Sequence, residues 1–222
     1  ILVEIVVYKV STREYSMKLT RTGYITPDTP EVKKELTVRP VVNGDFGQAP
    51  PSFKVFRKSK TGLCVPRFYG EQKFGTPQED NRPEPAKIKI NFKGKLRDET
   101  FQNTALSKAV EAGHGVLSLP CGFGKTTVSL AIACKLGYRT MIVVHKEFLA
   151  NQWRERIQQF CPGATIGIVQ QNKKEINCDF VIAMLQSLSL KEYSFGDFDS
   201  IGTLIVDEAH HICAKVFSQS LF

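Results

Sequence analysis

The apolar positions in the first third of the chain come in short runs that are typical of β-strands. Residues 1–10, ILVEIVVYKV, are rich in β-branched side chains, and FKVFRKS at 53–59 and LCVPRFYG at 63–70 flank a KTG turn. This pattern predicts a strand and, later in the chain, a hairpin. Between them, Thr29 and Pro30 precede EVKKEL. That order predicts an N-cap, a proline at the first helical position and a short helix.

After residue 87 the pattern changes to an alternation of helical and strand-like segments. The helical segments are ETFQNTALSKAVEA at 99–112, KTTVSLAIACKL at 125–136 and EFLANQWRERIQQF at 147–160. The strand-like segments are GVLSLP at 115–120, TMIVV at 140–144, TIGIVQ at 165–170, DFVIAM at 179–184 and GTLIVD at 202–207. Continuously apolar strands that alternate with helices are typical of a parallel sheet with crossover helices, so we expect an α/β fold.

Two of these helices are expected to bury one face each. In the first helix the apolar face consists of Phe101, Ala105, Leu106 and Ala109. In the third helix the residues at roughly helical spacing are Phe148, Trp153, Ile157 and Phe160. A single helical tryptophan is usually a core residue, although Trp153 could also be a platform on which a base stacks.

A polar segment separates the two parts of the chain. Residues 75–87, GTPQEDNRPEPAK, contain three prolines and one glycine. Such a segment cannot hold a helix and has little to bury, so it is typical of a linker. We therefore expect a small α+β accessory domain at residues 1–80, a linker at 81–87 and an α/β lobe at 88–222.

Positive charge is concentrated in the front part. The 222 residues include 30 Lys and Arg against 22 Asp and Glu, a net charge of +8, of which residues 1–90 contribute +6 and residues 91–222 contribute +2. A basic domain indicates a polyanionic partner such as nucleic acid, although a soluble protein can be basic without one. The run FKVFRKSK at 53–60 suits contact with DNA and also suits a plain amphipathic strand.

Nothing in the sequence indicates a membrane or secreted protein. The apolar runs are far shorter than the roughly 18–20 residues of a membrane span. The chain opens ILVEIVV without a basic segment, which favours a fragment boundary at Ile1 over a signal peptide. The six cysteines lack the close spacing of a zinc site, so we expect reduced thiols in the cytoplasm or nucleus. Cys121 could be a redox switch, but a small filler residue is the simpler interpretation.

The segment LPCGFGKTT at 119–127 stands between an expected strand and an expected helix. Gly122 and Gly124 let the backbone pass close to phosphate oxygens, which the amides at a helix N-terminus bind. Lys125 would reach the β- and γ-phosphates of ATP, and Thr126 would bind Mg²⁺. The general phosphate-loop pattern begins with glycine where this chain has leucine, so a chance GKT is the alternative. The expected loop residues are Pro120, Cys121, Gly122, Phe123, Gly124, Lys125, Thr126 and Thr127.

The segment TLIVDEAHH at 203–211 places two carboxylates at the end of an apolar strand, where a parallel sheet forms its binding site. Asp207 can hold Mg²⁺ through water, and Glu208 is placed to orient and deprotonate an attacking water molecule. A DEAH tetrapeptide alone is equally consistent with an exposed helix start. Its position, 82 residues after Lys125 and at the end of a later strand, favours the catalytic interpretation.

The combination of GFGKT and DEAH resembles the superfamily 2 helicases and translocases. KLRDETFQ at 95–102 looks like their upstream LR-x-x-Q segment, IVVHKEFLANQW at 142–153 looks like motif Ia, and VIAMLQSLS at 181–189 looks like motif Ib. Together with VPRFYGEQKFG at 65–75, these motifs are similar to those of the helicases of nucleocytoplasmic large DNA viruses. That group includes the poxvirus transcript-release helicase and is related to XPB-like helicases.

The resemblance implies roles that the residues alone do not. It implies that residues 88–222 form the first RecA-like lobe, which is incomplete, and that a second lobe is absent from this chain. It implies that Gln102 reads adenine and that His210 couples the nucleotide site to the other lobe. It also implies positions near the DNA backbone for Lys146, Gln152, Gln186 and Ser187.

The expected function is that of an ATP-dependent DNA helicase or translocase, with ATP and Mg²⁺ as cofactors and a place in viral transcription or replication. Its expected catalytic residues are Lys125, Asp207, Glu208 and His210. Double- or single-stranded DNA is the expected partner, with transcription machinery as a further one. One alternative is an RNA helicase, although the DEAH-box RNA class shows GETGSGKT where this chain shows PCGFGKT. Another is a non-motor binding module whose conformation ATP gates.

Overall fold

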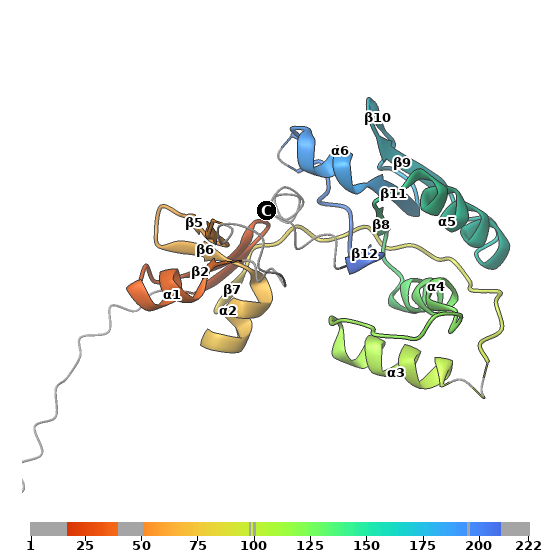
Figure 1. Ribbon diagram of the computed structural model, residues 1–222, viewed down its shortest axis with the longest axis horizontal. Coiled ribbons are helices and arrows are strands. Elements are labelled where there is room, and N and C mark those ends of the chain that lie inside the picture. The colour runs from red at the N-terminus through yellow and green to blue at the C-terminus, as the bar shows by residue number, and fades with distance from the viewer. Residues whose placement is uncertain (1–16, 40–50, 98, 100, 195, 210–222) are drawn as a thin grey trace, which may run out of the picture. The chain divides into compact units, whose positions relative to one another are not determined.

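The chain forms two compact units, Ile1–Arg82 and Pro83–Phe222 (Figure 1). The computed structural model describes residues 17–39, 51–97, 99, 101–194 and 196–209. The strand expected at residues 1–10 lies outside this set. None of the helices in the described part is long and apolar enough to cross a membrane.

The first unit is built on a five-stranded sheet with the order β5-β6-β2-β1-β7. Its strands are β1 (Lys18–Thr20), β2 (Gly23–Thr26), β5 (Arg57–Lys58), β6 (Leu63–Val65) and β7 (Glu79–Asp80). The unit also contains β3 (Thr37–Val38), β4 (Phe53–Lys54), α1 (Pro30–Glu35) and α2 (Arg67–Phe74). Its core consists of Leu19, Tyr24, Val32, Leu36, Leu63 and Val65.

Two local predictions in this unit are confirmed. The Oγ1 atom of Thr29 accepts a hydrogen bond from the amide of Val32 at 3.3 Å, and Pro30 is the first residue of α1. The strands β5 and β6 pair in antiparallel register around the KTG turn, as expected for a hairpin. In both cases the local sequence is sufficient, because the cap and the turn depend on residues only a few positions apart.

The segment RFYG at 67–70, which the sequence assigns to a strand, is instead the first half of α2. Gly70 faces the buried ring of Tyr24, and a Cβ atom at this position would lie 2.3 Å from Tyr24 Cγ. The absence of a side chain at Gly70 therefore allows α2 to pack directly on β2. This contact joins residues far apart in the sequence, which is why the aromatic composition of the segment predicts the wrong element.

The segment 75–87 differs from a simple linker in one respect. Within it, Glu79–Asp80 form β7, which pairs in parallel with β1. The pairing depends on backbone hydrogen bonds between polar residues, and composition does not reveal these. After the unit boundary, the amide of Ala86 donates to the carbonyl oxygen of Ser200 at 2.9 Å, so this end of the segment is attached to the second unit.

The second unit contains a five-stranded sheet with the order β10-β9-β11-β8-β12. Its strands are β8 (Thr140–Val144), β9 (Ile166–Gln170), β10 (Lys173–Lys174), β11 (Phe180–Met184) and β12 (Thr203–Val206). Its helices are α3 (Gln102–Ala112), α4 (Lys125–Leu136), α5 (Glu147–Phe160) and α6 (Leu185–Leu190). The strands β9, β11, β8 and β12 are parallel, whereas β10 pairs antiparallel with β9. The predicted α/β fold is thus confirmed.

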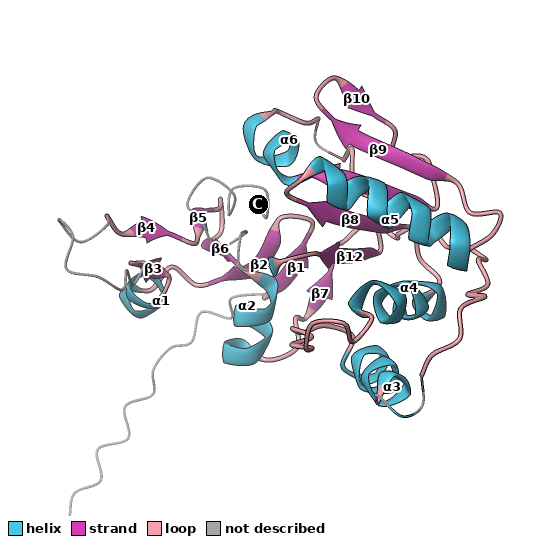
Figure 2. Cartoon of the chain, turned by 45° about the vertical axis from the view of Figure 1, so that its right-hand side comes forward, coloured by secondary structure: helices cyan, strands magenta, loops and turns pink. Residues whose placement is uncertain are grey.

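Both faces of this sheet are covered. One face of β8 and β11 packs against α4 and α5, and Figure 2 shows α5 running along these strands. The opposite face packs against α6 and the segment that follows it. Successive residues of a strand point to opposite faces, so a strand covered on both faces buries every residue. The central strands are therefore continuously apolar in sequence.

The strand expected at residues 115–120 is not formed. Val116 in this segment is 87% exposed. Gly113 ends α3 with a left-handed φ of 71°, which changes the direction of the chain before residue 115. Among the described strands, β12 forms the edge of the sheet next to β8, and no strand from residues 115–120 pairs with it. The short apolar run at 115–120 is typical of a strand, but an apolar run does not determine whether a neighbouring strand pairs with it.

Two aromatic residues do not lie on the buried helix faces predicted for them. Phe101 is 74% exposed and precedes α3 in a left-handed conformation, so it does not share the helical spacing. Phe148 is 63% exposed on α5, and the Nζ atom of Lys146 lies 5.9 Å from its ring centroid. Trp153 and Ile157 are buried, as expected.

Candidate nucleotide-binding site

The glycine-rich loop leads directly into α4. Gly124 adopts a left-handed conformation with φ 90° and ψ 41°, and the helix begins at Lys125. The amide of Val128 donates to the carbonyl oxygen of Gly124 at 3.1 Å. The amides of the preceding residues have no acceptor within the helix, and they carry the positive end of the helix dipole. With Lys125 exposed in the first turn, this arrangement fits an anionic phosphate group.

The loop is held from behind by Gln102 and Arg97. The Gln102 side chain is 2% exposed; its Oε1 accepts from the Arg97 amide at 2.7 Å, and its Nε2 donates to the Phe123 carbonyl oxygen at 2.5 Å. The guanidinium of Arg97 donates to the carbonyl oxygens of Gly122 and Phe123 at 2.9 and 2.8 Å. Gln102 and Arg97 therefore fix the backbone of the loop. The adenine-reading role of Gln102 stays a prediction.

Gly124 is required at its position for two reasons. Its φ of 90° is unfavourable for residues with a side chain. A Cβ atom there would also lie 2.8 Å from Gln102 Nε2. The sequence did not assign Arg97 a role, although it stands within the quoted segment KLRDETFQ. Arg97 is 25 positions before Gly122 in the sequence, and only the fold brings its side chain to the loop.

The acidic pair follows β12. The amide of Asp207 donates to the carbonyl oxygen of Val143 at 3.0 Å, which extends the ladder between β12 and β8 by one residue. The amide of Glu208 donates to Asp207 Oδ1 at 3.1 Å. Glu208 is exposed and has a φ of 51°, which is uncommon for a residue other than glycine. Such conformations are concentrated at functional sites.

Trp153 connects this carboxylate to α5. Its indole Nε1 donates to Asp207 Oδ2 at 2.9 Å, and the side chain is 3% exposed. The core interpretation of Trp153 is thus correct, and a stacked base has no access to its ring. No sequence pattern indicates this hydrogen bond, because the two residues are 54 positions apart.

The phosphate loop and the acidic pair belong to one packed substructure. The helix α4, which begins at Lys125, contacts β12, which ends just before Asp207. Ile205 of β12 packs against the apolar cluster that contains Leu130 of α4. Oxygen ligands are what Mg²⁺ prefers, and the hydroxyl of Thr126 and the carboxylate of Asp207 supply that type of donor.

The residues expected near nucleic acid follow the carboxyl ends of two adjacent parallel strands, β8 and β11. Gln186 Nε2 donates to the carbonyl oxygen of His145 at 2.8 Å, which joins the two strand ends. Lys146, Gln152 and Gln186 are exposed. The hydroxyl of Ser187 accepts from the amide of Gln171 at 3.0 Å. His210 lies outside the residues that the structure describes.

A parallel α/β lobe with a glycine-rich loop at a helix N-terminus and an acidic pair at a strand end defines the class of P-loop nucleotide-binding proteins. Within this class, residues 93–221 match the family described as "Type III restriction enzyme, res subunit", and the chain belongs to that family. The family assignment supports the RecA-like fold that the motif resemblance implies.

The chain is similar to proteins that are named as helicases. It is 34% identical over 218 residues to "Putative ATP-dependent RNA helicase L396" of Acanthamoeba polyphaga mimivirus, covering 90% of this chain and 41% of that protein. It is 34% identical over 158 residues to "DNA 3'-5' helicase XPB" of Mycobacterium tuberculosis, covering 65% of this chain and 28% of that protein. The chain thus spans less than half of either relative.

Among solved structures, the chain is similar to the one described as "Sulfolobus solfataricus SWI2/SNF2 ATPase core in complex with dsDNA". The TM-score is 0.45 at 20% identity, over 61% of this chain and 30% of that chain.

Proposed function

We propose that this chain is the ATP-binding part of an ATP-dependent DNA helicase or translocase. The observation that carries the proposal is the packing of α4, which begins at the phosphate loop, on β12, which leads into Asp207 and Glu208. This packing joins the helix that follows the phosphate loop to the strand that precedes the two carboxylates, which supports a single site built from both segments. The family match and the names of the two relatives support the helicase assignment.

Each residue has a separate role in this proposal. Lys125 and the first amides of α4 bind the phosphates, and Gln102 and Arg97 keep the loop in the conformation that exposes those amides. Thr126 and Asp207 would hold Mg²⁺, which when bound neutralises charge on the phosphates. Glu208 orients water and accepts its proton, and His210 couples the site to a second lobe. Phosphoryl transfer to water needs such positioning and charge more than covalent chemistry.

We favour DNA over RNA as the substrate. The phosphate loop reads PCGFGKT, and the KLRDETFQ segment and the Gln152–Trp153 pair follow the DNA helicase resemblance. An RNA helicase is the second candidate, because the mimivirus relative carries that name. More specifically, we propose that the complete protein is a DEAH-type viral enzyme, similar to the poxvirus transcript-release helicase. It would act with transcription machinery in the cytoplasm or nucleus.

The phosphate-binding role can be tested on this chain by calorimetric titration with ATP and Mg²⁺. Replacing Lys125 with alanine removes a charged contact worth about 1.5–3 kcal/mol, so the affinity is expected to fall by about 10-fold or more. The matched control is Lys135→Ala, which removes an exposed lysine from the opposite end of the same helix. Equal affinities for the two variants would refute the proposed nucleotide site.

A further inference from the structure

Two cysteines of the second unit lie side by side. Cys134 is in the last turn of α4, Cys161 is the C-cap residue of α5, and their Sγ atoms are 3.6 Å apart although the residues are 27 positions apart in sequence. The two helices contact each other, and both cysteines belong to the same apolar cluster. A disulfide needs a separation of about 2.0 Å, so a relative movement of about 1.5 Å would bring the sulfurs to bonding distance.

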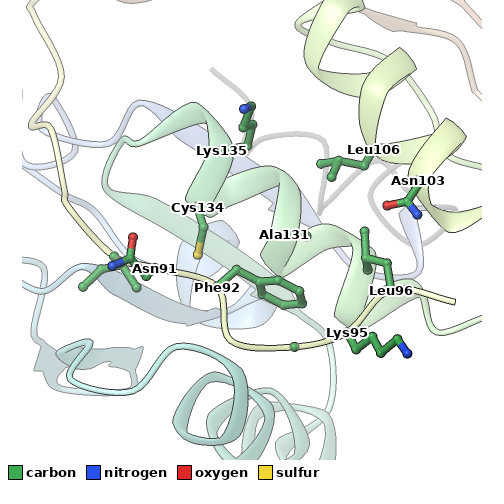
Figure 3. A pocket seen from close by; sticks show the side chains of 11 residues that line it. Asn91, Phe92, Lys95, Leu96, Asn103, Leu106, Ala131, Cys134 and Lys135 are labelled. Carbon is green, nitrogen blue, oxygen red and sulfur yellow. The ribbon is translucent and has the colours of Figure 1, made fainter. Parts of the chain in front are cut away.

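Only one of the two thiols is accessible to a reagent. Cys161 is 1% exposed, whereas Cys134 is half-buried and lines a pocket of about 480 Å³. Figure 3 shows Cys134 on α4 in this pocket, together with Phe92, Lys95 and other side chains. A small oxidant can therefore approach Cys134 first, while Cys161 is held behind it.

The electrostatics favour the same order. The hydrogen bond from the Cys161 thiol lowers the pKa of Cys134, and the same contact together with burial raises the pKa of Cys161. The thiolate is the reactive form of cysteine, so the more accessible of the two thiols is also the one that ionises more readily.

We propose that Cys134 and Cys161 are a peroxide-sensitive thiol pair, which hydrogen peroxide converts into a disulfide that joins the end of α4 to the end of α5. The Cys134 thiolate attacks one oxygen of the peroxide, the O–O bond breaks, and a sulfenic acid and hydroxide form. The Cys161 sulfur then attacks Cys134 Sγ, the S–S bond forms and the S–O bond breaks. The hydroxide ions take up the two thiol protons, so two thiols and one peroxide give one disulfide and two waters.

The cross-link joins two helices that carry residues of the nucleotide-binding site. The helix α4 begins at Lys125, and α5 carries Trp153, the hydrogen-bond partner of Asp207. The disulfide closes the chain between the two cysteines and restricts the unfolded state. The oxidised second unit is therefore more resistant to heat than the reduced one.

The test treats the whole chain with hydrogen peroxide, blocks the remaining thiols and digests with trypsin without a reductant. The expected product is peptide 126–135 joined to peptide 157–173, lighter than their sum by two hydrogens. The melting temperature of the second unit, followed by the fluorescence of Trp153, is expected to rise by about 5 °C or more and to return after treatment with dithiothreitol.

The free thiols Cys121 and Cys178 provide the comparison. The variant Cys178→Ser should retain both the joined peptide and the melting shift, whereas Cys134→Ser should lose both. Peptide mapping of the peroxide-treated chain without substitutions tests for the disulfide even if Cys134→Ser does not fold. Oxidation confined to the exposed Cys121, or a joined peptide without a melting shift, would overturn the proposal.

Discussion

At the residue scale, the two carboxylates after β12 lie in different environments. Asp207 is half-buried and accepts a hydrogen bond on each oxygen, from the Glu208 amide and from Trp153. Glu208 is exposed at the next position, with a left-handed backbone. The half-buried carboxylate is thus held in place, as a metal-holding residue should be. The exposed carboxylate can reach water.

This difference predicts different effects of two isosteric substitutions in the complete protein. Glu208→Gln should retain the binding of ATP and Mg²⁺ but abolish hydrolysis, because an amide can orient water but cannot accept its proton. Asp207→Asn should instead weaken binding in the presence of Mg²⁺. Titration calorimetry and phosphate release would measure the two effects. If both variants lost affinity equally and nothing else, the proposed division of roles would be wrong.

The hydrogen bond from Trp153 gives a second prediction at this scale. Trp153→Phe retains a ring in the core but removes the indole N–H that orients Asp207. Partners that orient a metal ligand typically affect metal affinity by 10–100-fold, so the Mg²⁺ concentration for half-maximal ATP hydrolysis should rise by about 10-fold. A Mg²⁺ titration of the complete protein measures this change.

The control for this substitution must separate orientation from packing. Ile157→Val removes one buried methyl group from the same face of α5 and costs about 0.5–1.5 kcal/mol of stability. It should leave the Mg²⁺ requirement unchanged. A shift of similar size in both variants would assign the effect of Trp153→Phe to lost packing.

At the element scale, α2 packs on β2 through Gly70. An added Cβ atom would lie 2.3 Å from the ring of the buried Tyr24, so Gly70→Ala should destabilise the first unit by about 1–3 kcal/mol. Urea unfolding followed by far-UV circular dichroism should show this loss. The fluorescence of Trp153, which is in the second unit and is the only tryptophan of the chain, should show an unchanged transition.

The comparison for Gly70→Ala is Gln72→Ala in the same helix. Gln72 is exposed, and surface substitutions usually change the stability by less than about 0.5 kcal/mol. A similar, small effect for both variants would show that α2 can move away from β2 at little cost.

The elements that the sequence predicted correctly are those that depend on local chemistry. The cap of Thr29, the loop before Lys125 and the apolar runs of β8 and β11 each involve neighbouring residues or burial on both faces of a sheet. The helix at RFYG and the unpaired segment 115–120 depend instead on what lies opposite them in space. The contacts of Arg97 and Trp153 have the same character, since each crosses more than 20 positions of sequence.

At the scale of the whole molecule, the excess of positive charge lies in the first unit and the candidate nucleotide site lies in the second. Lys58 and Lys60 are exposed around the turn between β5 and β6. Arg67, by contrast, forms an ion pair with Glu71 at 2.8 Å, so its charge is partly neutralised within α2. The hairpin lysines are therefore the better candidates for contact with DNA phosphates than the cations of the adjacent helix.

This arrangement predicts a local effect of charge on DNA binding. The double variant Lys58→Gln, Lys60→Gln should weaken the binding of duplex DNA by the whole chain. The slope of log K against log salt should become shallower by about 0.9 for each lost phosphate contact.

The matched control is the double variant Lys18→Gln, Lys33→Gln, which removes the same charge from the first unit at lysines paired with Glu79 and Asp28. Binding isotherms at several salt concentrations compare the two. Equal slopes for both double variants would mean that net charge alone attracts the DNA. An unchanged DNA affinity in the Lys58→Gln, Lys60→Gln variant would instead indicate that this hairpin binds a protein partner.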